Sequence, residues 1–199
     1  PFRARFQDKK PGDSEILIKK ENKDELREPP APAIQIDRVE QFVKEFIAVG
    51  GNLNRTNAND LTNKVLDLLQ SKGITRIHLG TNVLDEDLLQ KAGIMTSHTP
   101  DPGIRAGVTK SICGLADTGS ILEKDGEGDP LHASLLPEIH IALLRESEIL
   151  PSLDQGIHLV RESKSAAFIT GPSRTGDIEM SQTIGVHGPG EVHVFLVDE

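Results

Sequence analysis

The chain has 199 residues, of which 36% are hydrophobic and 27% are charged, and its formal net charge is −9. A chain of this length is large enough for one hydrophobic core and small for two. Acidic residues are in excess, no basic stripe is present, and Trp and Tyr are absent, so we expect binding neither to nucleic acid nor to an anionic membrane surface.

Cysteine content and hydropathy narrow the class of protein further. A single cysteine cannot build a disulfide framework, a cysteine-rich zinc site or a four-thiolate iron–sulfur cluster within this chain. We therefore expect no cofactor and no metal held by this chain. No apolar run approaches the roughly 20 residues that span a bilayer, and no secretory signal is present. A cytoplasmic protein without a membrane span is expected.

The first 33 residues differ in character from the rest. Residues 1–33 are charged and proline-containing, and they show no sustained hydrophobic period. We expect an N-terminal arm that either packs by contact or is mobile. A single α/β domain is expected over residues 34–199.

Helical and strand patterns then alternate. Predicted helices cover residues 37–49, residues 59 or 60 to 73, and residues 85 or 87 to 93; predicted strands cover residues 53–56, 74–79 and 94–97. One face of the first helix carries the apolar residues Val39, Phe42, Val43, Phe46 and Ile47. This alternation is typical of a mostly parallel sheet with helices on its faces.

Further elements follow a turn-rich loop at residues 98–103. Predicted strands cover residues 120–123, 139–144, 166–170 and 192–197, and short helices are predicted over residues 131–136 and 151–162. The continuous apolar run at residues 139–144 predicts a central strand, in which His140 is expected to be a satisfied core histidine.

The stretch at residues 171–189 (GPSRTGDIEMSQTIGVHGP) is the best candidate for a site. In an open α/β sheet, ligands bind at the carboxyl ends of strands, beside the N-terminus of the next helix. Gly171 permits a close backbone approach, and Ser173, Arg174 and Thr175 supply donors suited to a phosphate or carboxylate. The alternative is that Ser173 or Thr175 only caps a following helix, with Arg174 solvated.

The same stretch contains three acid–base candidates, Asp177, Glu179 and His187. His187 lies in a rigid Gly/Pro turn that leaves little beside the imidazole to cover it, which suits a proton donor or a ligand. The alternative is that the two carboxylates complement a helix dipole and that His187 is an ordinary turn histidine.

A second polar turn contains Asp117, Thr118, Gly119 and Ser120. Gly119 is expected to supply backbone freedom. The other three side chains are expected to face the same cleft as the 171–175 stretch, and the alternative is an Asx or Ser/Thr turn that serves only the backbone. Cys113, which lies among apolar residues, is expected to be a buried and inert thiol.

Three segments resemble one known family. Residues 171–199 (GPSRTGDIEMSQTIGVHGPGEVHVFLVDE) closely resemble the C-terminal signature of the LUD-domain family, of the lactate-utilisation protein C type. Residues 108–123 (VTKSICGLADTGSILE) and 131–143 (LHASLLPEIHIAL) resemble its second and third signatures. Asp117 stands where Glu is also often seen, and Cys113 stands where a small residue is usual.

The resemblance implies a sugar-isomerase/CoA-transferase-like α/β fold and a role in oxidising L-lactate to pyruvate. It implies two iron–sulfur partner proteins, which would hold the clusters, and it favours residues 117–120 as a wall of the site. It transfers no catalytic residue. A stand-alone enzyme or binding protein for a phosphorylated, nucleotide or CoA-like molecule, and a purely structural or regulatory subunit, are the alternatives.

Overall fold

The computed structural model describes residues 37–80, 82–125, 131–161, 163–176, 182–184 and 188–198. The predicted arm at residues 1–33 and the predicted site residues Asp177, Glu179 and His187 lie outside this part of the chain. Of Thr175, only the backbone is described. The expectations for these residues remain predictions.

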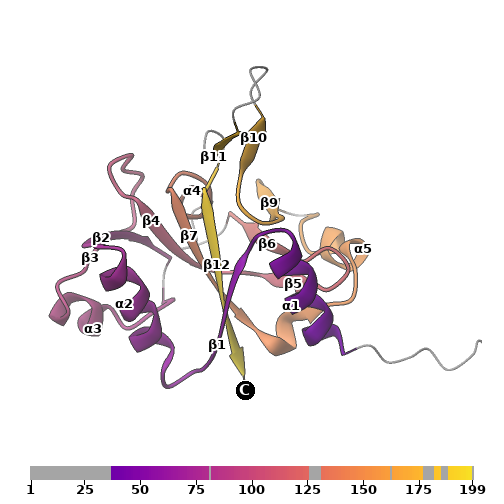
Figure 1. Ribbon diagram of the computed structural model, residues 1–199, viewed down its shortest axis with the longest axis horizontal. Coiled ribbons are helices and arrows are strands. Elements are labelled where there is room, and N and C mark those ends of the chain that lie inside the picture. Colours follow the sequence, from indigo (N-terminus) through magenta and orange to yellow (C-terminus); the bar gives the residue numbers. More distant parts are fainter. Residues whose placement is uncertain are drawn as a thin grey trace, which may run out of the picture. The chain divides into compact units, whose positions relative to one another are not determined.

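A six-stranded sheet forms the centre of the fold, and every pairing between its neighbouring strands is parallel (Figure 1). The strands, in spatial order, are β1 (Asn52–Asn57), β12 (Glu191–Asp198), β7 (Ile139–Arg145), β4 (Ala106–Lys110), β2 (Arg76–Leu79) and β3 (Met95–Ser97). The predicted mostly parallel α/β fold is confirmed. The apolar strand β7 lies inside the sheet, as its sequence indicates.

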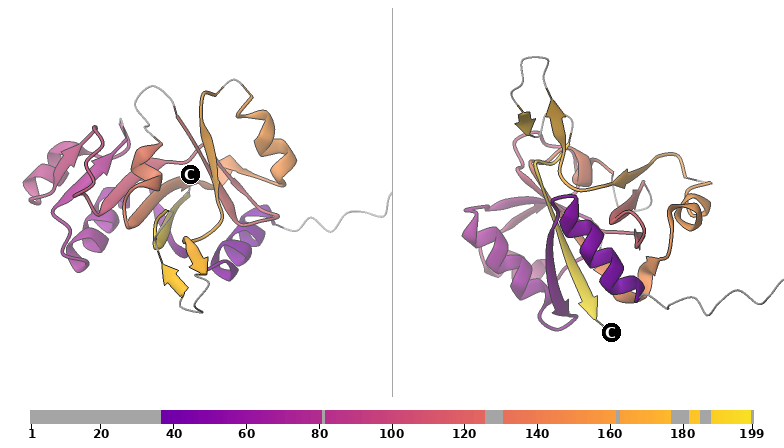
Figure 2. Two further views of the ribbon diagram at one scale, coloured as in Figure 1. Left: turned by 90° about the horizontal axis from the view of Figure 1, so that it is seen from above. Right: turned by 45° about the vertical axis from the view of Figure 1, so that its right-hand side comes forward.

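Helices cover both faces of this sheet (Figure 2). Side chains alternate along a strand, so Ile141 of β7 packs with α2 (Leu61–Ser71) and α3 (Glu86–Lys91) on one face. Its neighbours Ala142 and Leu144 face the other side, where they pack with Phe42 and Phe46 of α1 (Arg38–Ala48). The sheet therefore has one apolar core on each of its two faces.

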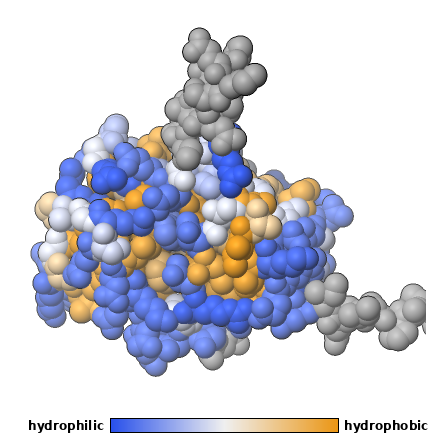
Figure 3. Space-filling view, in the orientation of Figure 1, coloured by the Kyte–Doolittle hydropathy of each residue, from blue (hydrophilic) through white to orange (hydrophobic). Residues whose placement is uncertain are grey.

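Helix α1 begins where its sequence indicates, because the Asp37 side chain accepts a hydrogen bond from the Val39 N–H at 3.0 Å. One position of its predicted apolar stripe is different: Ile47 is 55% exposed. On the face drawn in Figure 3, apolar residues appear among hydrophilic ones. Phe42 and Phe46 alone of this stripe are fully buried.

A second, four-stranded sheet packs beside α1. Its order is β8 (Ile149–Leu150), β5 (Cys113–Leu115), β6 (Ser120–Lys124) and β9 (Ala166–Ile169). The predicted strand at residues 120–123 is confirmed as β6. The predicted strand at residues 166–170 exists as β9, but it pairs with β6 rather than within the parallel sheet. Of its four residues only Ile169 is buried, because β9 lies at a sheet edge.

Short elements lie between the strands of the two sheets. They are α4 (His132–Leu135), the 3-10 helix η1 (Glu146–Glu148), α5 (Leu153–His158) and the antiparallel pair β10 (Arg174–Gly176) and β11 (Gln182–Ile184). Helix α4 approaches β4 closely because Gly107 has no side chain: a Cβ there would lie 1.8 Å from the Ala133 carbonyl oxygen. Among the described helices, none combines the length and apolar character needed to cross a bilayer.

Candidate functional site

The 171–174 loop begins one residue after β9 and wraps around the C-terminal end of α1. Gly171 has φ +72°, and a Cβ on it would lie 2.4 Å from the Val49 carbonyl oxygen. At the other end of the loop, the Ser173 N–H donates to the Pro189 carbonyl at 2.8 Å. The close approach expected at Gly171 is therefore made to α1, and the loop backbone is held from two sides.

Arg174 extends from this loop over the end of α1. Its side chain is exposed, and Nη2 donates to the Val49 carbonyl at 3.4 Å. A Cβ on Gly50 would lie 2.3 Å from the same Nη2, so the glycine makes room for the guanidinium. Carbonyl groups at a helix C-terminus attract a cation. The arrangement presents a fixed positive charge at the surface, which can bind a carboxylate or phosphate.

The loop does not lie where an open α/β sheet places its ligands. It follows the carboxyl end of β9, which is a strand of the second sheet, and it contacts Val49 and Pro189, which shortly precede the first residues of β1 and β12. The amino edge of the parallel sheet, rather than its carboxyl edge, is nearest. The helix expected after the loop is also wrong, because residues 174–176 form strand β10. Ser173 therefore caps no helix there.

The 117–120 turn packs against the last turn of α1 and touches the segment that leads into the 171–174 loop. Gly119 has φ +62°, and a Cβ on it would lie 2.3 Å from the Phe46 backbone nitrogen. The hydroxyls of Ser120 and Thr170 are 2.7 Å apart. The structure thus brings the turn and the loop together around one helix. The backbone freedom predicted for Gly119 is confirmed, and close packing is a second reason for the glycine.

Among the described residues, the side chains of Asp117 and Thr118 form no hydrogen bond with the 171–174 loop, and only that of Asp117 has a hydrogen-bond partner. Asp117 is exposed, and its carboxylate accepts from the Leu153 N–H at 3.1 Å, at the first residue of α5. This contact satisfies a free N–H at a helix start. The Oγ1 atom of Thr118 is buried and has no hydrogen-bond partner among the described residues. Of the polar side chains in the turn, Ser120 alone is seen to contact the segment leading into the loop.

The sequence indicated only one member of a buried polar group, His140, which was expected to be a satisfied core histidine; its Nδ1 has no hydrogen-bond partner among the described residues. Thr109, Ser111, Glu123 and His140, which we call the buried cluster, come from β4, the residue after it, β6 and β7, and each is at most 3% exposed. The Ser111 hydroxyl donates to Glu123 Oε1 at 2.6 Å, and Thr109 Oγ1 lies 2.8 Å from His140 Nε2. Glu123 Oε1 lies 3.8 Å from the same imidazole nitrogen. These contacts tie the two sheets together.

Burial determines the charge state of this imidazole. Loss of hydration, together with a smaller effect of the nearby His193, lowers the pKa of His140 to about 3. The contact with Glu123 therefore involves a neutral imidazole and is not an ion pair. The expected inert thiol is also consistent with the structure: Cys113 is 2% exposed, and burial raises the pKa of its thiol to about 11.

Comparison with known proteins locates these features within one family segment. A model of the LUD domain family matches residues 103–197, a range that includes the buried cluster, the 117–120 turn and the 171–174 loop. This chain is 36% identical over 101 residues to Lactate utilization protein C 1 of Bacillus mycoides (strain KBAB4), covering 47% of this chain and 43% of that protein. The corresponding values for Lactate utilization protein C of Anoxybacillus flavithermus are 38% over 96 residues, 47% and 44%. These alignments span less than half of either relative.

Longer matches also exist. Lactate utilization protein C of Deinococcus radiodurans is 25% identical over 177 residues, covering 84% of this chain and 83% of that protein. A crystal structure of a DUF162 family protein from Deinococcus radiodurans has a TM-score of 0.62 at 20% identity and covers 81% of this chain and 96% of that chain. At this identity the structural match supports the fold alone. The sugar-isomerase/CoA-transferase-like resemblance remains a prediction.

Proposed function

We propose that the protein takes part in lactate utilisation by binding a small carboxylate at the 171–174 loop, on the premise that residues 103–197 match a model of the LUD domain family. The names of its relatives support the pathway. The observation that carries the site is the exposed guanidinium of Arg174, held over the end of α1 by a loop that is fixed from two sides.

In this proposal Arg174 orients the substrate. A guanidinium fork can donate two parallel hydrogen bonds to a carboxylate, which fixes both the position and the plane of the ligand. Once the carboxylate of lactate is fixed, the position of its hydroxyl-bearing carbon relative to the protein is fixed as well. His187, with Asp177 and Glu179, remains the predicted source of acid–base chemistry.

Electrons from lactate require an acceptor, and we propose that two iron–sulfur partner proteins hold it. The residues of this chain do not suit a cluster, since Cys113 is its one cysteine and the thiol is buried among apolar residues. The chain would then bind the substrate or organise its partners, and the isolated chain is expected to be inactive on lactate.

The test is lactate-dependent dye reduction by this chain reconstituted with its two partner proteins. We expect Arg174→Ala to raise the KM for lactate by about tenfold or more, because a charge-assisted pair is lost. Arg174→Lys should recover only part of the loss, since an ammonium lacks the fork. Arg161→Ala, which removes an exposed arginine from a different part of the chain, is the matched control.

Equal activity of the wild type, Arg174→Ala and Arg161→Ala would exclude the loop as the carboxylate site. Saturable binding of phosphate, a nucleotide or coenzyme A to the isolated chain, lost in Arg174→Ala, would instead support a stand-alone enzyme or binding protein. A variant of this chain can be folded and yet fail to assemble with the two partner proteins. That result would concern the role of the chain in organising its partners, rather than the ligand site.

A further inference from the structure

Strand β3 forms one edge of the parallel sheet. It pairs with β2, and no other described strand pairs with it. The Met95 N–H donates to the Thr75 carbonyl, so the Met95 backbone faces the strand β2 side. Since successive residues of a strand direct their backbone groups to opposite sides, the N–H and C=O of Thr96 face away from the sheet. They form a ready donor–acceptor pair for another strand.

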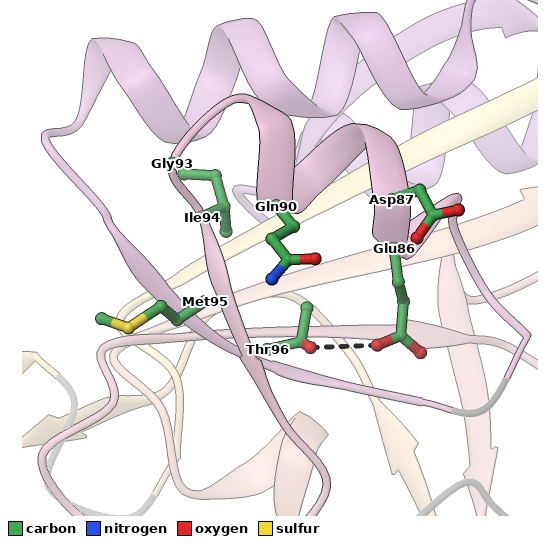
Figure 4. A pocket seen from close by; sticks show the side chains of 7 residues that line it. All are labelled: Glu86, Asp87, Gln90, Gly93, Ile94, Met95 and Thr96. Atoms are coloured by element: carbon green, nitrogen blue, oxygen red, sulfur yellow. Dashed lines mark hydrogen bonds between the residues drawn. The ribbon is translucent and has the colours of Figure 1, made fainter.

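A groove of about 590 Å³ lies beside this edge, between α3 and β3 (Figure 4). Gln90 and Glu86 project from α3 on the side of the groove, and Thr96 faces them from β3. Met95 lies at one end and is 59% exposed. The groove thus combines a free strand edge, hydrogen-bonding side chains and an exposed apolar side chain.

The charge of the groove is negative. Glu86 and Asp87 line it, and no lysine or arginine does so. Glu86 accepts from the Thr96 hydroxyl at 3.0 Å, and its other oxygen lies 3.5 Å from His98 Nε2. Natural proteins commonly protect an edge strand with a charged residue or a proline. The three residues of β3, Met95, Thr96 and Ser97, include neither.

We propose that the edge of β3 and its groove bind an extended, basic segment of a partner protein, which adds a strand to the parallel sheet. The backbone of Thr96 would pair with the segment, in the manner of other peptides that extend a sheet. Its lysine or arginine side chains would lie along Met95 with their charged ends at Glu86 and Asp87. This proposal is independent of the ligand at the 171–174 loop.

The first test uses a fluorescent peptide with alternating lysine and valine, and a peptide in which glutamate replaces lysine. We expect saturable binding of the basic peptide alone, weakened by salt. The double variant Glu86→Gln, Asp87→Asn should weaken binding by about fivefold or more, because two surface charge pairs together contribute on the order of 1 kcal/mol. The variant Asp67→Asn, Asp154→Asn makes the same change in net charge on exposed residues elsewhere and should bind like the wild type.

The second test locates the bound peptide. Hydrogen exchange of the Thr96 amide should slow by about tenfold or more at saturation, and a basic peptide with N-methylated backbone positions should not produce this protection. Equal affinity for the basic and acidic peptides, equal loss of binding in both double variants, or unchanged exchange at Thr96 with bound peptide would each overturn the proposal. Both double variants replace exposed carboxylates by amides of similar size, and circular dichroism verifies that they are folded.

Discussion

The buried cluster and the 171–174 loop are both polar, and both lie in the segment that matches the LUD domain family, but they satisfy their polar groups differently. In the buried cluster, Ser111 donates to Glu123 and Thr109 contacts His140 inside the protein. In the loop, the backbone is fixed while the Arg174 side chain is exposed. Polar residues of the same segment are therefore buried with partners in one region and exposed in the other.

The physical reason is the penalty for burying polar groups. A polar atom removed from water without a partner destabilises the fold by about 1–3 kcal/mol, so most buried groups are tied to partners, with His140 Nδ1 and Thr118 Oγ1 as exceptions among the described residues. An exposed guanidinium carries no such penalty and is available to a ligand. We therefore expect substitutions in the buried cluster to change stability and substitutions of exposed loop side chains to change binding. Four predictions test this division.

The largest expected effect concerns the backbone that supports the site. Gly119→Ala introduces a Cβ 2.3 Å from the Phe46 backbone nitrogen, at φ +62°, and should lower the free energy of unfolding by about 3 kcal/mol or more. Gly73→Ala is the matched control, because Gly73 has φ +64° and no atoms within 4 Å of the added Cβ. Urea denaturation measures both.

The contrast between these two glycines isolates packing from backbone strain. Gly73→Ala should lower stability by about 1 kcal/mol through strain alone. If both variants lose the same free energy, the contact between Gly119 and α1 contributes nothing, and the position of the 117–120 turn is fixed by other contacts.

The next effect compares two serines. Ser111→Ala removes a hydrogen bond to a buried carboxyl group and should lower the free energy of unfolding by about 1.5–3 kcal/mol. Ser173→Ala, in the partly exposed loop, leaves the backbone hydrogen bond to Pro189 in place and should change stability by less than about 0.5 kcal/mol. Equal losses in the two variants, measured by urea denaturation, would remove the distinction between the two regions.

A third prediction concerns pH. The pKa of His140 is about 3 in the folded protein, whereas its ordinary value is 6.5. At a pH between these two values, the unfolded chain binds a proton at this residue and the folded chain does not. Its contribution to stability is complete above pH 6.5 and is lost as the pH falls, by up to about 1.4 kcal/mol per pH unit. His140→Gln should show a shallower decrease between pH 7 and pH 5.

The control for this slope is Arg174→Ala, whose pH dependence should match that of the wild type. The free energies of unfolding of the wild type and both variants, measured at pH 7, 6 and 5, give the slopes to be compared. A His140→Gln variant with the wild-type slope would show that the imidazole is protonated in the folded protein or that other groups determine its acid sensitivity.

Local patterns predicted much of the fold. The 3.6-residue period of α1, with Phe42 and Phe46 on one face, identifies a helix and its buried side, and the apolar run of β7 identifies an internal strand. The second sheet was not predicted, because its strands are short and their partners are far apart in sequence. Ile121 pairs with Ile169 and Gly114 with Ile149, and neither pairing leaves a local signal.

The arrangement of the candidate site residues was also predictable only in part. Residues 117–120 and 171–174 were expected to lie together, and Ser120 does contact Thr170, beside the loop. The direction of Asp117 depends on where α5 begins, which no pattern near Asp117 reveals. Glu123 had a usable signal: it lies two residues after the buried Ile121 and so on the same face of β6. A carboxyl group on a buried face requires a polar partner.

The smallest expected effect on stability belongs to Arg174. Its side chain is exposed and makes a 3.4 Å contact with Val49, so Arg174→Ala should change the free energy of unfolding by less than about 0.5 kcal/mol. Thermal denaturation and urea denaturation measure this directly. A variant that is as stable as the wild type, and yet loses lactate-dependent activity in the reconstituted system, would assign the loss to the ligand rather than to folding. A loss of more than about 2 kcal/mol would place Arg174 with the buried cluster, as a residue whose contacts hold the fold together, and the carboxylate site would have to be sought elsewhere on the chain.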